Sequence, residues 1–195
     1  MRLLLLFPIF FATLLATDQV DITGMARCGL TTNFFRTQFS PFLGTFSSIP
    51  AELNITYHPL SIGSKTTANG SKIAVCSNGE LECELNKLQC CSKKYVKNYN
   101  STVLLATIAC IQGKTSLEQG ILCLKNEKNA GKIKTCAKSE EGVKLLLAEP
   151  FPHNYAITLP WIKINGVRNA EAGKNFQKVI CQLKSAKNEE SCKKR

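Results

Sequence analysis

Ten cysteines in a chain of 195 residues constrain the fold of this protein more than any other feature of its sequence. In a cytosolic protein such a set would suggest zinc, but the chain has only two histidines and no paired Cys-x-x-Cys motif. Structural disulfides formed in an oxidising compartment are the better interpretation. We therefore expect a disulfide-stapled protein of the secretory pathway, with no metal site.

The N-terminal segment points to the same compartment. A basic start is followed by the apolar run LLLLFPIFFATLLA, which predicts a secretory signal peptide over residues 1–17. This run is too short for a membrane span, and no later stretch reaches the roughly 20 apolar residues that a span needs. The sequence also carries three N-glycosylation sequons, at Asn54, Asn69 and Asn100. We expect a secreted glycoprotein with a single domain over residues 18–195.

The net charge of +11 comes mainly from lysines scattered through the second half of the chain. Nucleic-acid binding would need clustered Lys and Arg with aromatic residues between them, and the only compact basic run lies at residues 192–195. A solvated lysine-rich surface is the better interpretation, and we expect no nucleic-acid partner.

One cysteine stands in a distinctive setting. Residues 21–31, DITGMARCGLT, predict a short strand that runs through a loop into the first turn of a helix, with Cys28 at the junction. Backbone N–H groups and the helix dipole favour a negative charge there, so we expect a stabilised thiolate, and Arg27 acts in the same direction. A cysteine at position 31 would complete the Cys-x-x-Cys of a thioredoxin-like reductant, but Thr31 stands there.

Hydrophobic periodicity predicts a strand, a helix and a second strand in the first third of the chain. Val20 and Ile22 alternate with polar neighbours, a helix follows Cys28 with a kink before Pro41, and residues 53–59 alternate again. This order is typical of a parallel α/β sheet.

The pattern then changes before the sheet resumes. Residues 61–148 lose the alternation and contain seven cysteines, with helix starts predicted at 101–102, at the capping box beginning at Thr115, and at Ser139. We interpret this region as a disulfide-stapled helical insertion. A strand is expected over 157–167, where Pro160 starts the strand and Asn165-Gly166 forms a hairpin turn, followed by an amphipathic helix over 176–183.

Other polar residues suggest no separate chemistry. Asp21 and the pair Glu140-Glu141 are interpreted as strand-edge or helix-start charges in solvent. His58 falls in a predicted strand and His153 in a proline-rich loop, and neither has a partner at the spacing of a metal site or a nucleophile. His153 could line the approach to Cys28, because its loop leads into the strand that Pro160 starts.

The run CSNGELECELNKLQCC, residues 76–91, resembles the signature C-Q-H-G-x2-E-C-x2-N-x4-C of the gamma-interferon-inducible lysosomal thiol reductase family. Ser77 and Asn78 replace the Gln and His of that signature. Residues 152–155, 159–161 and 164–166 resemble the C-terminal half of the same family. The positions of the signature that fall in register are Cys76, Gly79, Glu82, Cys83, Asn86 and Cys91.

The resemblance implies a thioredoxin-like fold interrupted by a helical insertion, in a secreted or lysosomal glycoprotein. It implies reduction of protein disulfides at acidic pH without a cofactor beyond an external small thiol, and it implies that Pro160 is a cis-proline facing Cys28. Eight cysteines match the structural set of the family, although their pairing stays open: Cys76, Cys83, Cys91, Cys110, Cys123, Cys136, Cys181 and Cys192.

Three hypotheses follow from the threonine at position 31. In the first, Cys28 acts as a monothiol, and an external thiol or another cysteine completes the cycle, with Cys90 as the leading internal candidate. In this hypothesis the Thr31 hydroxyl could also donate a hydrogen bond to the thiolate. In the second, the protein is a catalytically impaired secreted glycoprotein that uses the scaffold as a binding module. In the third, Cys28 and Cys90 form a structural disulfide.

Overall fold

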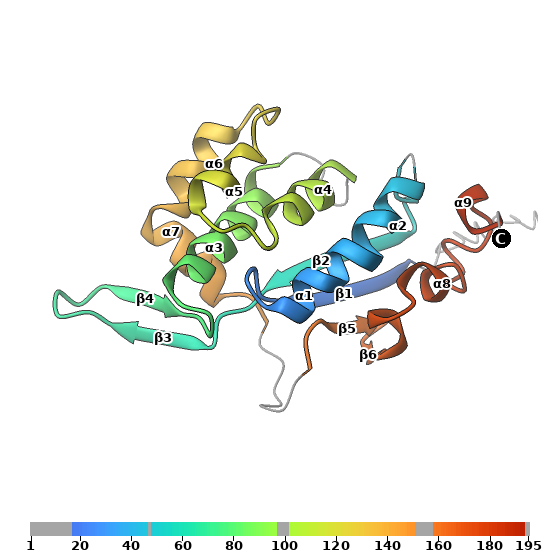
Figure 1. Cartoon of the computed structure of the whole chain (residues 1–195), viewed down its shortest axis with the longest axis horizontal. Helices are drawn as coiled ribbons and strands as arrows, with labels where there is room; N and C mark the ends of the chain where they lie inside the picture. The colour runs from blue at the N-terminus through green and yellow to red at the C-terminus, as the bar shows by residue number, and fades with distance from the viewer. Residues whose placement is uncertain (1–16, 47, 97–101, 151–157, 194–195) are drawn as a thin grey trace, which may run out of the picture.

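The fold is built on a four-stranded mixed sheet, against which helices pack (Figure 1). The computed structural model describes residues 17–46, 48–96, 102–150 and 158–193, so nearly all of the predicted signal peptide lies outside the described residues. β1 pairs parallel with β2 and antiparallel with β5, which confirms the predicted α/β class. The strand order is β2-β1-β5-β6, and the strands are Leu53–Pro59, Asp18–Gly24, Trp161–Ile164 and Val167–Arg168.

The helix after Cys28 consists of three consecutive segments. They are α1 (Gly29–Phe34), a π-helical turn (Phe35–Phe39) and α2 (Ser40–Thr45). The π-helical turn lies where the kink is predicted, directly before the helical turn that contains Pro41, which has no N–H to donate to the preceding turn. Three phenylalanines of this stretch pack their rings against Phe176, with centroids 5.0 to 5.6 Å apart, so the helix covers one face of the sheet with a dense aromatic core.

The insertion is built around one long helix. α3 (Glu80–Tyr95) packs against the shorter helices α4 (Thr102–Ile111), α5 (Leu117–Leu122), α6 (Ala130–Ala137) and α7 (Glu140–Leu147). A disulfide between Cys91 and Cys136 joins α3 to α6, and another between Cys110 and Cys123 joins α4 to the end of α5. These links confirm a disulfide-rich helical insertion on a thioredoxin-like sheet.

The insertion is not helical throughout, contrary to the prediction for residues 61–148. It begins with a β-hairpin, β3 (Gly63–Thr66) and β4 (Lys72–Val75), which projects away from the rest of the molecule (Figure 1). All four residues of β3 are exposed. Because neither face of that strand is buried, its sequence shows no apolar alternation and carries no strand signal.

Two of the three predicted helix starts agree with the structure and one is wrong by one residue. α4 begins at Thr102, as predicted. Ser139 caps α7 by accepting a hydrogen bond from the N–H of Glu141. α5 is capped by Ser116 rather than Thr115, because Ser116 Oγ accepts from the N–H of Gln119 at 3.2 Å. Which of two adjacent hydroxyl residues caps a helix depends on the local backbone direction, and the sequence does not show that direction.

The C-terminal elements follow the prediction in order but not in length. The Asn165-Gly166 turn is present, with φ of 50° and 81° at its two residues, values that the hairpin turn requires. The last predicted helix is shorter, α8 (Phe176–Ile180). A disulfide between Cys181 and Cys192 joins its end to the additional helix α9 (Glu190–Lys193). No helix of the described part of the chain is long and apolar enough to cross a membrane.

Candidate functional site

Cys28 lies at the end of the loop after β1, at the first turn of α1. Its backbone is extended (φ −67°, ψ 124°), and its carbonyl accepts the first helical hydrogen bond from the N–H of Thr32 at 2.9 Å. The thiol is free and partly exposed. Cys28 is therefore a free, partly exposed cysteine in the N-cap position of a helix.

A small apolar cluster surrounds Cys28. Cys28 and Trp161 pack against three buried residues, Met25, Leu60 and Leu159. The peptide bond between Leu159 and Pro160 is cis. The residues on both sides of Pro160 therefore contact the same cluster as Cys28, although they are more than 130 positions away in sequence.

Two side chains of α3 hold the loop that leads into α1. Asn86, which is fully buried, accepts a hydrogen bond from the N–H of Ala26 at 2.9 Å and donates one to the carbonyl of Leu60 at 2.9 Å. Glu82, one turn earlier, accepts from the N–H of Arg27 at 3.2 Å. These bonds tie the loop to the insertion, so both residues are positioning residues for the thiol.

A third clamp comes from the end of α4. The side-chain amide of Gln112 donates to the carbonyls of Met25 and Ala26 at 2.8 and 2.9 Å, and to Thr32 Oγ1 at 3.1 Å. The N–H of Gly113 also donates to the carbonyl of Ala26 at 2.8 Å. The loop therefore has its backbone polar groups satisfied by two different helices of the insertion, which makes its conformation specific.

The signature at residues 76–91 forms the start of α3, which makes some of these contacts. Cys76 and Cys83 form a disulfide across the N-terminus of α3, and Gly79 between them has φ 86°, a conformation that favours glycine. Asn78, which stands where the family has histidine, donates to Glu82 through both its backbone N–H and its side-chain amide. The signature thus builds the helix start that supports the loop before the thiol.

Thr31 does not make the hydrogen bond considered for it. Its side chain is fully buried, and Oγ1 has no hydrogen-bond partner among the described residues. The residue faces the end of β1, because a Cβ built on Gly24 would lie 2.5 Å from Thr31 Cγ2 and 2.9 Å from the hydroxyl of Tyr57. The expectation that this hydroxyl stabilises the Cys28 thiolate is therefore wrong.

Cys90 is poorly placed to act as a second thiol. It is free and buried on α3, and its sulfur is 3.8 Å from Glu149 Oε1. Burial raises the pKa of the Cys90 thiol well above its usual value, and the negative charge of Glu149 acts in the same direction. Since Cys28 and Cys90 are both free, the hypothesis of a disulfide between them is wrong.

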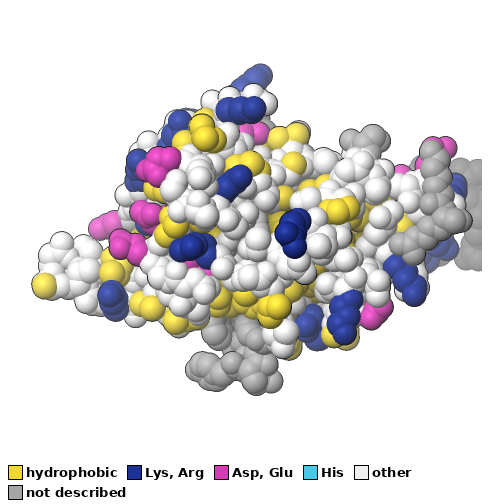
Figure 2. Space-filling model, in the orientation of Figure 1, with side chains coloured by type: hydrophobic (Ala, Val, Ile, Leu, Met, Phe, Trp, Pro, Cys, Tyr) yellow, Lys and Arg dark blue, Asp and Glu magenta, His cyan; other side chains and the backbone are white. Residues whose placement is uncertain are grey.

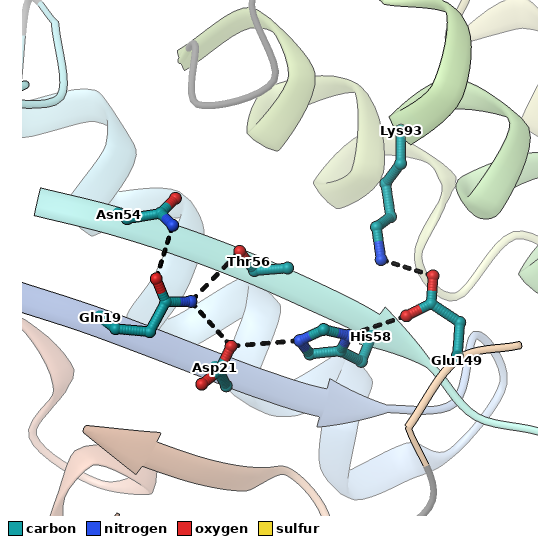
Figure 3. Close-up of polar contacts among 7 residues, drawn as sticks. All are labelled: Gln19, Asp21, Asn54, Thr56, His58, Lys93 and Glu149. Atoms are coloured by element: carbon teal, nitrogen blue, oxygen red, sulfur yellow. Dashed lines mark hydrogen bonds and ion pairs between the residues drawn. The ribbon is translucent and has the colours of Figure 1, made fainter. Parts of the chain in front are cut away.

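A row of ionisable side chains runs from β1 across β2 to the residues of the insertion (Figure 3). His58 contacts Asp21 Oδ1 through Nε2 at 3.2 Å and Glu149 Oε2 through Nδ1 at 2.7 Å, and Lys93 Nζ contacts the other oxygen of Glu149 at 2.5 Å. Burial alone would raise the pKa of Glu149, but the hydrogen bond from His58 and the charge of Lys93 outweigh it, so this pKa is lowered.

The position of Asp21 in the sheet shows that its interpretation as a strand-edge charge is wrong. Asp21 belongs to β1, which lies between β2 and β5 inside the sheet. Glu149 reaches His58 from just after α7, 91 positions later in sequence. No local spacing signals such a contact, and among the described residues no group of three metal-binding side chains could hold an ion.

The remaining predicted site residues fall in several places. The side-chain nitrogen of Asn54, within β2, donates to Gln19 Oε1 at 2.5 Å, whereas Asn69 is exposed in the turn between β3 and β4. Asn100 and His153 lie outside the described residues. Glu141 accepts from Lys94 Nζ at 2.6 Å and so is not a purely solvated charge. The eight remaining cysteines pair as Cys76–Cys83, Cys91–Cys136, Cys110–Cys123 and Cys181–Cys192.

Fold and site together define the class: this is a thioredoxin-like protein with a disulfide-rich helical insertion and one free thiol at the helix start. Residues 19–140 match the model of the gamma interferon inducible lysosomal thiol reductase (GILT) family. The chain belongs to this family, and membership assigns it to the lysosomal thiol reductase type.

Several relatives support the assignment. A GILT-like protein of Caenorhabditis elegans is 30% identical over 181 residues, which covers 84% of this chain and 79% of the relative. A GILT-like protein of Caenorhabditis briggsae is 31% identical, with the same two coverages. The gamma-interferon-inducible lysosomal thiol reductase of Mus musculus is 25% identical over 176 residues, 85% of this chain and 67% of the relative.

Proposed function

We propose that the protein is a monothiol thiol–disulfide oxidoreductase that reduces protein disulfides through Cys28. The observation that carries this proposal is the free, partly exposed cysteine at the start of α1, in contact with the residues around the cis-proline. Thiol–disulfide exchange requires an unpaired and accessible thiol, and Cys28 is free and partly exposed.

The chemistry proceeds in two exchanges. The Cys28 thiolate attacks one sulfur of a substrate disulfide, so a mixed disulfide forms and the other substrate sulfur leaves as a thiolate that takes up a proton. Thr31 has no sulfur to resolve this adduct, and Cys90 is buried with a protonated thiol. Two equivalents of an external small thiol therefore complete the cycle, releasing the substrate as a dithiol and the external thiol as its disulfide.

The structural features that support a secretory or lysosomal location are the disulfides. Four of them are present in the described chain, a density typical of oxidising compartments. The mouse relative is itself named as lysosomal. We propose that residues 1–17 are removed as a signal peptide and that the mature protein carries glycans. The exposed turn at Asn69 is the sequon best placed to accept one among the described residues.

The test is reduction of insulin at about pH 5 by the mature protein, with cysteine as the external reductant. We expect turnover by the native chain and by Cys90→Ala, none by Cys28→Ser, and faster turnover by Thr31→Cys, which restores a second thiol. Mass spectrometry of the trapped mixed disulfide should place the substrate on Cys28. Because serine is a good N-cap residue, Cys28→Ser is a matched control that should preserve the fold.

The alternative function, a binding module without redox activity, makes the opposite forecast for the same assay. Its one structural support is the threonine that replaces the second thiol in a fully buried position. If the native protein and Cys28→Ser are equally inactive while Thr31→Cys reduces insulin, the binding-module function is supported. The fold then still positions a pair of thiols correctly, but the native chain lacks reductase activity.

A further inference from the structure

A groove of about 420 Å³ is lined by both sequence neighbours of Cys28 and lies on the side of α1 that faces the end of α4. This volume is within the range of small-molecule binding sites. Its lining comes from the loop before the helix, from α1, from the π-helical turn and from the residue after Gln112: Arg27, Gly29, Thr32, Asn33, Arg36 and Gly113.

Two of the residues that line the groove are glycines. Gly113 packs so closely on α1 that a Cβ there would lie 2.6 Å from Thr32 Cγ2, and its φ of 76° also favours glycine. At Gly29 a Cβ would meet nothing within 4 Å, so the first turn of the helix is open to a ligand. A bound molecule could therefore come close to the backbone at Gly29.

The groove is cationic. Arg36 donates to Asn33 Oδ1 at 3.2 Å, and the guanidinium of Arg27 has no hydrogen bond or ion pair to any described residue. No acidic side chain lines this groove, whereas three other grooves of the described residues each include a glutamate. On the face seen in Figure 2, separate basic side chains lie near the middle of the molecule, whereas several acidic side chains lie on the side nearer the β3–β4 hairpin.

The groove is formed in part by residues next to Cys28 in the sequence. Arg27 and Gly29, which line it, are the two neighbours of Cys28. A peptide of three residues spans about 10 Å when extended, so a small thiol bonded to Cys28 can place its carboxylates among the two arginines. A neutral or cationic thiol would gain nothing there.

We propose that this groove binds the carboxylates of a short acidic peptide thiol, which resolves the Cys28 mixed disulfide in place of the missing second cysteine. The inference rests on the proposed monothiol function. The thiolate of the peptide attacks the Cys28 sulfur, the substrate leaves as a thiol, and a peptide–Cys28 disulfide forms. A second peptide thiolate then attacks the peptide sulfur, giving the peptide disulfide and the free Cys28 thiolate.

The test compares glutathione with its diethyl ester, which has the same thiol but no free carboxylate. The full mature chain is first treated with 2,2′-dithiodipyridine, which leaves an uncharged pyridyl disulfide on Cys28, and the release of 2-thiopyridone by each thiol is then timed. We expect glutathione to react about fivefold faster than the ester, the size of one or two exposed ion pairs. In Arg27→Gln/Arg36→Gln this ratio should fall close to one.

The ratio cancels any effect of the substitutions on Cys28 itself, because both thiols attack the same adduct. The matched control is Lys132→Gln/Lys134→Gln, which removes the same charge from two exposed positions on α6 and should keep the ratio. An equal fall in both double variants, or no fall in either, overturns the groove as the binding site.

A binding measurement separates this inference from the proposed function. Cys28→Ser is titrated with glutathione, and backbone amide shifts are followed by NMR. Shifts confined to Gly29, Asn33 and Gly113 support the groove even if Cys28 proves chemically inert. If Cys28 forms the pyridyl disulfide but these amides do not respond and the ratio is one, the groove is refuted while the monothiol mechanism stands.

Discussion

Replacing Thr31 by valine tests the account of the site most directly. The Thr31 hydroxyl is fully buried and unpaired, and a buried hydroxyl without a partner costs about 1–3 kcal/mol. Valine has nearly the same shape and replaces the hydroxyl by a methyl group. Thr31→Val should therefore raise the free energy of unfolding by about 1–2 kcal/mol, or the Tm by about 2–8 °C for a chain of this size.

The assay is urea unfolding of the mature protein with its disulfides intact, followed by the fluorescence of Trp161. Thr31→Ser serves as the control, because it keeps the hydroxyl and removes the Cγ2 methyl that packs against the end of β1. We expect Thr31→Ser to lower the free energy of unfolding. A lower stability of Thr31→Val would show that the hydroxyl has a partner and would refute the reasoning.

The same variant has a kinetic forecast. If the hydroxyl plays no part in stabilising the thiolate, Cys28 in Thr31→Val should attack a model disulfide at the native rate in a single turnover. A clear loss of rate in Thr31→Val, with the fold intact, would restore the hydrogen bond to Cys28 that the structure does not contain.

Three further predictions follow from the site. Asn86→Ala leaves two buried backbone groups unpaired and should cost about 2–4 kcal/mol in urea unfolding, with slower attack by Cys28 because the loop loses its clamp. A thiol reagent should label Cys28 at once in the folded protein and Cys90 only after unfolding, as peptide mapping would show. Glu149→Gln should cost about 2 kcal/mol at neutral pH, and pH-dependent unfolding should show this difference persisting down to about pH 4.5 and shrinking below it.

The sign of the last prediction follows from the lowered pKa of Glu149. A carboxyl group whose pKa is lower in the folded state than in the unfolded state stabilises the fold when the pH is above its unfolded-state pKa. That stability is lost as the pH falls through the folded-state pKa. Lys94→Gln is a suitable comparison, since its ion pair with Glu141 is exposed and should contribute far less. Rapid labelling of Cys90 in the folded protein, or an unchanged rate in Asn86→Ala, would contradict the packing described for α3.

Much of the fold could be predicted because it depends on neighbouring residues. The position of Cys28 at a helix start follows from the alternation of β1 and the helical spacing after it, and the Asn165-Gly166 turn follows from the two residues that adopt positive φ. The β3–β4 hairpin escaped prediction because its strand faces solvent on both sides and so leaves no pattern.

The sequence by itself determined a cysteine at a helix start, a disulfide-rich insertion and the absence of a second thiol at position 31. Only the tertiary structure decided that Asn86 and Gln112 hold the loop before that thiol, that Cys90 is buried beside Glu149, and that His58 bridges two carboxylates. These contacts join residues 37 to 91 positions apart, and hydrogen-bond partners at such separations are set by how helices and strands pack together. Local sequence patterns specify elements, whereas packing specifies which polar groups meet.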